Sequence, residues 1–339
     1  MVINVSNKLM KKNIGIVGAT GFVGEELVSL VNSRDDLALT FVSSVNSKGK
    51  KLSEVFPKIP IQEDLIIKSV DSVPNDLNFI FFATKHDFSM DYVPGILDKG
   101  IKVIDLSADF RLSNQEIWKE AYDTPHRAPA LLDKSVYGLP EYFQKEIKTA
   151  DLVAVPGCYP TASILGLLPL INKTKKDSSI IIDAKSGISG AGRSSVESSL
   201  EKDMKNNFKA YKTDFHRHTP EIQDFFYNIF KIQNEIIFIP HLIPIFRGEY
   251  ITAYVEVIEK ELNLVEIYND YYAGHESIRI KPKGEVPQIS EVINTNFCDI
   301  SVGYAYQSNK VIINSAIDNL IKGAAGQAIQ CLDIMLNVE

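Results

Sequence analysis

Three glycines near the start of the chain are spaced G-x-x-G-x-x-G, between an apolar run at 13–17 and a helix-like segment at 25–31. At Gly18 the strand can turn sharply, and at Gly21 backbone N–H groups can approach a pyrophosphate. Gly24 lets the helix pack closely against the strand. The order of strand, glycine turn and helix therefore predicts a nucleotide-binding turn. The alternative is a tight strand-to-helix turn without a ligand.

The rest of the first half alternates between apolar strands and helices. Further strands are predicted at 37–43, 77–83 and 101–106, and a polar helix at 90–99 is stopped by Gly100. Because strands and helices alternate in this way, we expect a parallel sheet that helices cover on both faces.

After about residue 157 the pattern changes. Several β-branched runs lie close together, which favours a largely antiparallel sheet with helices between its strands. The last segment has small apolar residues along one helical stripe, which suits close packing against a sheet. The predicted strands are 179–183, 236–240, 250–258 and 278–281, and the predicted helices are 159–172, 218–231 and 318–336.

The chain has 339 residues, which suggests two domains at about 150 residues each. The fold class we predict is α/β: a Rossmann-type doubly wound parallel sheet, with a second α+β domain of largely antiparallel sheet. Residues 1–157 plus 314–339 form the first domain, because the final helix is expected to return to it. Residues 158–313 form the second domain, and ligands are expected in the cleft between the two.

Composition and charge exclude several classes of protein. The net charge is -7 and no basic run occurs, which argues against a nucleic-acid partner. The contents of 45% hydrophobic and 23% charged residues exclude disorder of the whole chain. No stretch of about 18 consecutive apolar residues occurs, so no membrane span is predicted. Residues 1–13 contain no apolar signal core, and we expect a cytoplasmic protein.

Three cysteines are too few for a disulfide scaffold, and their spacing matches no metal site, so no metal is expected. Cys158 follows an apolar strand and a Pro-Gly turn, at or just before a helix with Pro160 in its first turn. The positive end of that helix would lower the pKa of the thiol, as an activated nucleophile requires. The alternative is a small buried residue that fills a turn. Cys298 and Cys331 lack such a setting and are interpreted as structural.

The end of the second predicted strand indicates which dinucleotide binds. An NAD site usually offers a carboxylate to the ribose hydroxyls at this point. Here the strand ends in Ser43 and Ser44, and Lys48, Lys50 and Lys51 follow. Hydroxyls and lysines suit a 2′-phosphate, so the sequence favours NADP. The alternative is a lysine loop that is only solvated.

Eight segments, in order along nearly the whole chain, carry a more specific signal. Together they resemble the N-acetyl-gamma-glutamyl-phosphate reductase family of arginine biosynthesis, which is related to aspartate-semialdehyde dehydrogenase in fold and chemistry. The segments are Gly18–Gly24 (GATGFVG), Asp105–Arg111 (DLSADFR), Tyr137–Glu141 (YGLPE), Val155–Pro160 (VPGCYP), Lys185–Arg193 (KSGISGAGR), His216–Glu221 (HRHTPE), Pro240–Gly248 (PHLIPIFRG) and Asn319–Ala328 (NLIKGAAGQA).

The resemblance implies reduction of an N-acetylated glutamyl acyl phosphate by NADPH to the semialdehyde, with release of phosphate. In this reaction the Cys158 thiolate would attack the acyl phosphate and leave a thioester, which hydride reduces to a thiohemiacetal. The thiohemiacetal then collapses to aldehyde and thiolate. The resemblance also implies a small-molecule substrate and a homo-oligomer.

Each half-reaction needs a proton carrier near the sulfur, and histidine suits this role near neutral pH. The resemblance places the acid/base on the element His216-Arg-His218, whose two imidazoles would share one face of an extended segment. We assign the acid/base to His218 and substrate binding to His216, with His241 as the second candidate. His86 is interpreted as close to the cofactor at most. The alternative is that the two histidines cap the following helix at the surface.

The substrate carries a carboxylate and a phosphate, for which arginine forks are the expected partners. Arg111, Arg193, Arg217 and Arg247 each lie in one of the family-like segments, and we expect one of them to make only a structural ion pair. Glu221 either orients a histidine or begins a helix. All five are assigned to substrate binding.

The predicted cofactor contacts lie in the glycine turn, at the ends of the second and third strands, in the segment after residue 185 and near the start of the last helix. They are Gly18, Thr20, Gly21, Phe22, Val23, Gly24, Ser43, Ser44, Lys48, Ala83, Ser186, Gly187 and Asn319.

Three other functions remain open on the sequence alone. Two are enzymes: aspartate-semialdehyde dehydrogenase, whose cysteine context differs from Pro-Gly-Cys-Tyr-Pro, and a reductase of carrier-protein-bound aminoadipyl phosphate in lysine synthesis. The third is a nucleotide-sensing regulator without chemistry. Such a regulator would need no thiol at a helix start opposite a His-x-His element.

Overall fold

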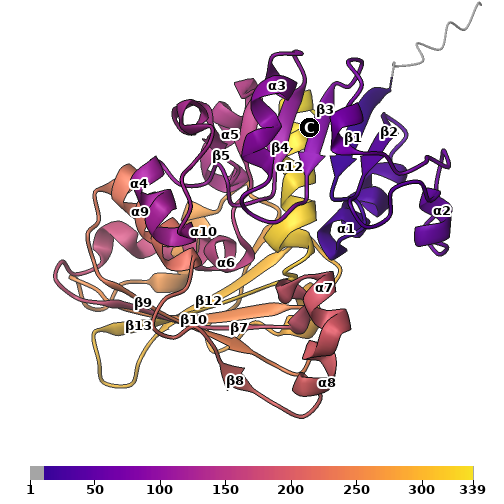
Figure 1. Cartoon of the computed structure of the whole chain (residues 1–339). Helices are drawn as coiled ribbons and strands as arrows, with labels where there is room; N and C mark the ends of the chain where they lie inside the picture. Colours follow the sequence, from indigo (N-terminus) through magenta and orange to yellow (C-terminus); the bar gives the residue numbers. More distant parts are fainter. Residues whose placement is uncertain (1–10, 339) are drawn as a thin grey trace, which may run out of the picture.

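The computed structural model describes residues 11–338 and contains two sheets, one above the other in the view of Figure 1. The prediction for the N-terminal segment falls largely on residues 1–10, which lie outside the described part. Between residues 11 and 338, no helix combines the length and the apolar character that crossing a bilayer requires.

The first sheet has six strands, all parallel, in the order β2-β1-β3-β4-β6-β5. In β3 the side chains of Phe79 and Phe81 enter one apolar cluster, and those of Ile80 and Phe82 enter another. The sheet is therefore buried on both faces, which confirms the predicted architecture. The strands are β1 (Lys12–Val17), β2 (Leu37–Ser43), β3 (Phe79–Phe82), β4 (Lys102–Asp105), β5 (Val136–Tyr137) and β6 (Leu152–Ala154).

The second sheet has seven strands in the order β11-β12-β13-β10-β7-β9-β8. Four of its six pairings are antiparallel and two are parallel, which confirms a largely antiparallel sheet. The sequence analysis did not identify β12 and β13. The strands are β7 (Ile180–Ser186), β8 (Lys209–Ala210), β9 (Ile236–Leu242), β10 (Glu249–Glu256), β11 (Ile278–Ile280), β12 (Cys298–Tyr304) and β13 (Lys310–Ile317).

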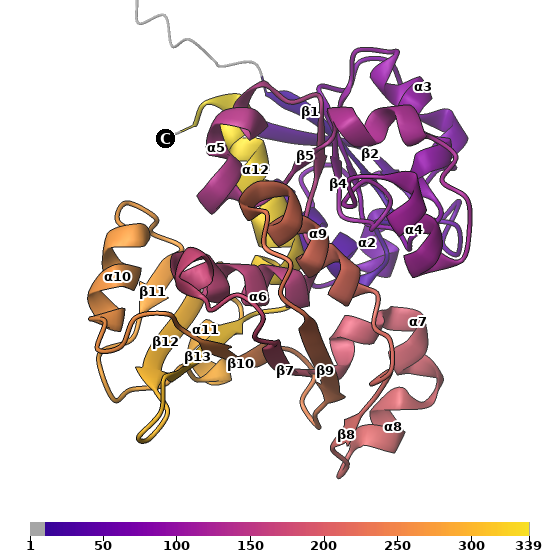
Figure 2. The ribbon, with the colours of Figure 1, turned by 90° about the vertical axis from the view of Figure 1, so that its left-hand side faces the viewer.

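Helix α6 (Cys158–Leu167) connects the two sheets, because it starts just after β6 and lies across the second sheet. Every residue from Tyr159 to Leu167 is buried. A Cβ on Gly166 would lie 3.3 Å from Ile313 Cγ2, so this glycine allows the helix to approach β13 closely. Helices α9 (His218–Phe230) and α10 (Leu264–Tyr271) lie on the same side of the sheet as α6 (Figure 2).

The end of the chain returns to the first sheet. A π-helical turn, η7 (Ile321–Ala325), leads into α12 (Gly326–Leu336), which lies among the first-sheet elements in both views (Figures 1 and 2). Apolar residues of α12, including Cys331 and Leu332, share a core cluster with Ile14 of β1. The remaining α-helices are α1 (Phe22–Asn32), α2 (Leu52–Val55), α3 (Val93–Leu97), α4 (Gln115–Tyr122), α5 (Pro140–Thr149), α7 (Arg193–Ser195), α8 (Glu201–Met204) and α11 (Ile289–Val292).

Candidate active site

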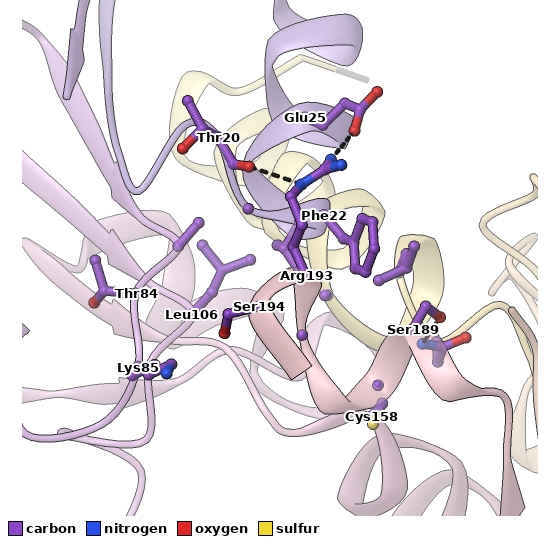
Figure 3. A pocket seen from close by; sticks show the side chains of 18 of the residues that line it. Thr20, Phe22, Glu25, Thr84, Lys85, Leu106, Cys158, Ser189, Arg193 and Ser194 are labelled. Carbon is purple, nitrogen blue, oxygen red and sulfur yellow. Dashed lines mark hydrogen bonds and ion pairs between the residues drawn. The ribbon is translucent and has the colours of Figure 1, made fainter. Parts of the chain in front are cut away.

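A cavity of about 720 Å³ lies between the two sheets and takes its walls from both halves of the chain (Figure 3). It is lined by the glycine turn, by Cys158 and His218, and by Arg193 and Asn319. A second cavity of about 580 Å³ shares Thr20, Gly21 and the segment 83–85 with the first and extends along the end of β2.

Gly18 and Gly24 play the roles that their spacing predicts, and Gly21 leaves open the space that its predicted role requires. Gly18 has a φ of 80°, and a Cβ there would lie 2.3 Å from the carbonyl oxygen of Ala83. A Cβ on Gly24 would lie 2.2 Å from Gly18 O, so only glycine allows α1 this close to the strand. By contrast, a Cβ on Gly21 would meet only Gly18 O, at 3.6 Å. No side chain caps the N-terminus of α1, so this end of the helix is suited to an anion.

The second cavity contains the predicted 2′-phosphate region. Ser43, Ser44 and Lys48 line it at the end of β2. The Ser44 hydroxyl lies 2.6 Å from the Thr20 hydroxyl, which links this end of the strand to the glycine turn. The second strand therefore presents hydroxyls and a lysine where an NAD site would present a carboxylate. Two carboxylates, those of Asp71 and Asp87, also line this cavity.

Cys158 is the first residue of α6 and lies half-buried in the first cavity. Gly323 of η7 packs on it, and a Cβ there would lie 2.7 Å from Cys158 Cβ. The prediction of a lowered thiol pKa is wrong for this structure. Burial raises the pKa of Cys158 well above its ordinary value, and the neighbouring Glu249 carboxyl raises it further, against smaller opposing effects of the Tyr159 N–H and of Arg111.

His218 is the first residue of α9 and lines the same cavity. A Cβ on Gly157 would lie 2.6 Å from His218 Nε2, so the imidazole packs directly against the residue that precedes Cys158. Burial, followed by the positive charges that surround the ring, holds the pKa of His218 well below its ordinary value. The imidazole is therefore neutral near pH 7, and its Nδ1 has no hydrogen-bond partner among the described residues.

The other candidate histidines lie outside this cavity. His216 accepts a hydrogen bond from the His218 backbone N–H at 3.2 Å, and burial lowers its pKa to about 4. His241 lies on the face of the second sheet opposite α6, with Nδ1 3.1 Å from Asp183 Oδ1. His86 lines the second cavity and lies 2.7 Å from an Arg217 Nη.

Arg111 and Glu221 together clamp the turn that carries Cys158. The Arg111 guanidinium donates to two backbone carbonyls, one of them that of Val155 at 2.8 Å. Glu221 accepts hydrogen bonds from the Gly157 N–H at 3.0 Å and from the Tyr137 hydroxyl at 2.8 Å. The two side chains also face each other, with 3.4 Å between Nη1 and Oε2. This buried network fixes the backbone immediately before the thiol.

Arg193 reaches across the first cavity to the glycine turn (Figure 3). Its Nε donates to the Thr20 carbonyl at 2.9 Å, and its guanidinium pairs with Glu25. The guanidinium carbon lies 4.3 Å from the centre of the Phe22 ring. A cation from the second half of the chain thus lies beside the predicted pyrophosphate site.

The remaining two arginines are engaged away from the first cavity. Arg217 contacts His86 and lies over the Tyr122 ring at 5.4 Å. Arg247 lies 2.9 Å from both Glu26 and Asp318. Arg247 thus makes structural ion pairs, as expected from the sequence for one of the four arginines.

One wall of the first cavity is formed by Ser189, in the segment after β7, and by Asn319, which follows β13. Asn319 accepts a hydrogen bond from the Gly248 N–H at 2.7 Å and donates to Ser189 Oγ at 2.9 Å, and both Asn319 and Ser189 line the cavity. The predicted contacts Ser186 and Gly187 lie behind this wall. A Cβ on Gly187 would meet the Phe246 carbonyl oxygen at 2.7 Å.

Sequence reasoning missed Glu249, the first residue of β10. Its carboxyl is fully buried and lies beside the Cys158 thiol, and burial raises its pKa to about 8. A signal for it exists, because Glu249 is in phase with Ile251, Ala253 and Val255 on the apolar face of an alternating strand. Among the described residues, no group of three or more His, Cys, Asp and Glu side chains is arranged to hold a metal.

Comparisons with known proteins agree with this geometry. A family model described as semialdehyde dehydrogenase, NAD binding domain, matches residues 13–150, and one described as semialdehyde dehydrogenase, dimerisation domain, matches residues 158–319. A protein of Geotalea daltonii named N-acetyl-gamma-glutamyl-phosphate reductase is 43% identical, over 95% of this chain and 94% of its own length. A protein of Campylobacter jejuni with the same name is 41% identical, over 97% of both chains.

Solved structures show the same fold at low sequence identity. Aspartate semialdehyde dehydrogenase II from Vibrio cholerae, in complex with ASA, has a TM-score of 0.75 at 17% identity and covers 97% of this chain and 99% of its own. Aspartate semialdehyde dehydrogenase with NADP from Candida albicans has a TM-score of 0.71 at 14% identity, over 97% of this chain and 100% of its own.

Proposed function

The chain belongs to the N-acetyl-gamma-glutamyl-phosphate reductase family of semialdehyde dehydrogenases, and we propose that it reduces N-acetylglutamyl 5-phosphate with NADPH. The products are N-acetylglutamate 5-semialdehyde and phosphate, in arginine biosynthesis. The observation that carries the proposal is the meeting of a thiol at a helix start, a neutral histidine and an uncapped glycine turn in one cavity.

The residues present fit a dinucleotide. The open space over Gly21 and the free N-terminus of α1 suit a pyrophosphate, and Ser43, Ser44 and Lys48 suit a 2′-phosphate. The same cavities are lined by Gly18, Thr20, Phe22, Val23, Ala83 and Asn319, whereas Gly24, Ser186 and Gly187 do not line them. When bound, NADPH supplies hydride to the carbon that Cys158 holds.

Cys158 is proposed as the nucleophile and His218 as the acid/base. Sγ attacks the acyl carbon, the bond from that carbon to the phosphate oxygen breaks, and a thioester to Cys158 remains. His218, which is neutral and lines the same cavity as Cys158, then carries the proton of the substrate oxygen as the tetrahedral species forms and collapses. Arg111 and Glu221 hold the Pro-Gly turn so that the sulfur keeps its direction.

The predicted substrate contacts differ in how directly they face the cavity. Arg111 and Arg193 line it, and we propose these two as the partners of the substrate anions. The other four residues do not line this cavity, and their predicted roles in substrate binding would be exerted through the protein groups that they contact. They are His216, Arg217, Glu221 and Arg247.

The proposal includes a cytoplasmic homo-oligomer of two domains. Their predicted ranges are 1–157 plus 314–339 and 158–313, but residues 314–317 belong to β13 of the second sheet, so the final segment begins its return to the first domain after Ile317. Support for an oligomer comes from the family description of residues 158–319 as a dimerisation domain. The face of the second sheet opposite α6 also exposes apolar side chains, with Ile181 38% and Ile237 37% exposed.

The function is tested by oxidising N-acetylglutamate semialdehyde in the presence of phosphate and following NADPH formation. We expect turnover that depends on phosphate and is faster with NADP than with NAD. Aspartate semialdehyde and a carrier-bound aminoadipate semialdehyde serve as competing substrates. Faster turnover of either one would replace the proposed substrate, and no phosphate-dependent turnover of any would favour a regulator.

Gly21→Ala is expected to weaken NADPH binding about tenfold or more while the fold stays intact. The backbone at Gly21 (φ -73°, ψ 170°) suits alanine and leaves room for a Cβ, so stability should change by less than about 1 kcal/mol. The added methyl group occupies the space through which a pyrophosphate approaches. Fluorescence titration with NADPH and thermal unfolding measure the two effects.

Gly95→Ala is the matched control, because Gly95 lies in α3 with no atom within 4 Å of an added Cβ. It should fold and bind NADPH as the unmodified chain does. Equal NADPH affinities for the two variants would show that the pyrophosphate does not pass over Gly21.

A further inference from the structure

Glu249 is a buried acid next to the reacting sulfur, and the mechanism above does not use it. Ile251, the next residue in phase along β10, contacts α6, because a Cβ on Gly166 would lie 3.8 Å from Ile251 Cδ1. Side chains two residues apart on a strand share a face, so Glu249 also points toward α6.

The position of Glu249 along the sheet brings it to the start of α6. In the register of β10 and β13, Glu249 is paired with Ile317. Ile317 and Cys158 both pack on Gly323, at 3.3 Å and 2.7 Å from an added Cβ. The strand register, the packing of α6 and the shared neighbour Gly323 therefore all place the Glu249 carboxyl close to the Cys158 thiol.

The carboxyl reaches the thiol from the interior of the protein. Glu249 is 0% exposed and does not line the cavity that Cys158 and His218 line. Neither carboxyl oxygen has a hydrogen-bond partner among the described residues. A buried acid without a hydrogen-bond partner destabilises the fold, so a role in exchanging a proton with the Cys158 thiol would explain its presence.

We propose that the Glu249 carboxylate takes the proton of the Cys158 thiol as Sγ attacks, and returns it when the thiolate is released. This inference rests on the proposed role of Cys158 as nucleophile. The S–H bond breaks and an O–H bond forms on Glu249, while the S–C bond forms and phosphate leaves with the electron pair of the C–O bond. His218, on the cavity side, is then left free to serve the substrate oxygen.

The surroundings of the pair are consistent with this exchange. Burial raises the pKa of the Glu249 carboxyl to about 8, which suits a proton acceptor working near neutral pH. The N-terminus of α6 favours the thiolate that results. The other titratable or charged groups around the pair are Arg111 from the loop after β4, Tyr159 of α6, Tyr211 after β8, and His216 and His218 at the start of α9.

The experiment is the pH profile of Cys158 alkylation by iodoacetamide in the purified full chain, with modification at Cys158 quantified by mass spectrometry. In the unmodified chain we expect the rate to rise with pH, level off near pH 8 as Glu249 ionises, and rise again at higher pH. Glu249→Gln should remove the plateau. It should also slow alkylation at pH 7 about tenfold, because an amide is a weaker donor to a thiolate than a carboxylic acid.

Two further variants complete the test. Glu249→Asp retains an ionisable carboxyl and should keep the plateau, which covers the case in which the glutamine variant folds poorly. Glu256→Gln makes the same chemical change farther along β10 and should leave the profile unchanged. Alkylation of Glu249→Gln that is as fast as, or faster than, that of the unmodified chain at pH 7 would overturn the proposal. Because no substrate is present, this outcome is independent of whether the proposed reductase activity is found.

Discussion

Cys158→Ser is expected to reduce phosphate-dependent oxidation of the semialdehyde by about 10⁴-fold or more, with NADPH affinity unchanged. A serine hydroxyl is of similar size and would occupy the same place at the start of α6. It ionises far less readily than a thiol, however, and it is a far poorer leaving group when the acyl-enzyme breaks down. The loss should appear in kcat, because the substrate pocket is intact. Steady-state kinetics measure the loss in kcat, and an NADPH titration measures the affinity for the cofactor.

Cys298→Ser is the control for this substitution. Cys298 is fully buried in β12, and its Sγ lies 3.2 Å from Ser315 Oγ, so a hydroxyl there finds a hydrogen-bond partner. This variant should keep its activity within about twofold, since the change is conservative and remote from the cavity. Substantial turnover by Cys158→Ser would remove the thioester route from the proposed mechanism.

The parts of the site that follow from local backbone geometry could be predicted from the sequence. The conformations of Gly18, Gly21 and Gly24 depend on the strand and helix that flank them directly, and the predicted turn at Gly18 and close packing at Gly24 agree with the structure. The start of α6 at Cys158 and of α9 at His218 follows in the same way from Pro-Gly and Thr-Pro signals nearby. The family resemblance added the chemistry that these positions carry.

What could not be predicted depends on contacts between distant segments. The thiol pKa was expected to fall because the helix end was the only neighbour that the sequence placed near Cys158. In the structure, burial and Glu249 from a different strand reverse the direction of the shift. Arg111 and Glu221 similarly lie far apart in the sequence, and only the fold shows that they clamp one turn.

A buried ion pair between Lys322 and Glu141 illustrates a further contact that sequence reasoning missed. Lys322 of η7 is 0% exposed, and its Nζ lies 2.5 Å from Glu141 Oε1 of α5 and 2.9 Å from Gln330 Oε1 of α12. Glu141 also accepts a hydrogen bond from Ser277, next to β11 of the second sheet. The pair thus joins the final segment to both sheets, close to the glycine that packs on Cys158.

Lys322→Met is expected to lower the free energy of unfolding by about 3–5 kcal/mol, because it leaves the Glu141 carboxylate buried without a cation. Thermal and urea unfolding of the purified chain measure the loss. Adding Glu141→Leu to this variant should recover much of it, since an apolar pair of similar volume avoids the cost of burying charge. Lys175→Met, which breaks an exposed pair with Glu256, should leave stability unchanged.

The pH dependence provides an independent check on the Lys322→Met variant. Burial tends to raise the pKa of Glu141, but Lys322 outweighs it and holds that pKa below the ordinary value of 4.5. The pair therefore contributes stability above about pH 4.5, and the contribution is lost as the pH falls below it. In Lys322→Met burial is opposed only by hydrogen bonds such as the one from Ser277, so the pKa of the carboxyl rises and acid relieves the penalty. The stability difference between the two proteins should narrow as the pH falls, and a difference that stays constant would show that lost packing, rather than lost charge, is its cause.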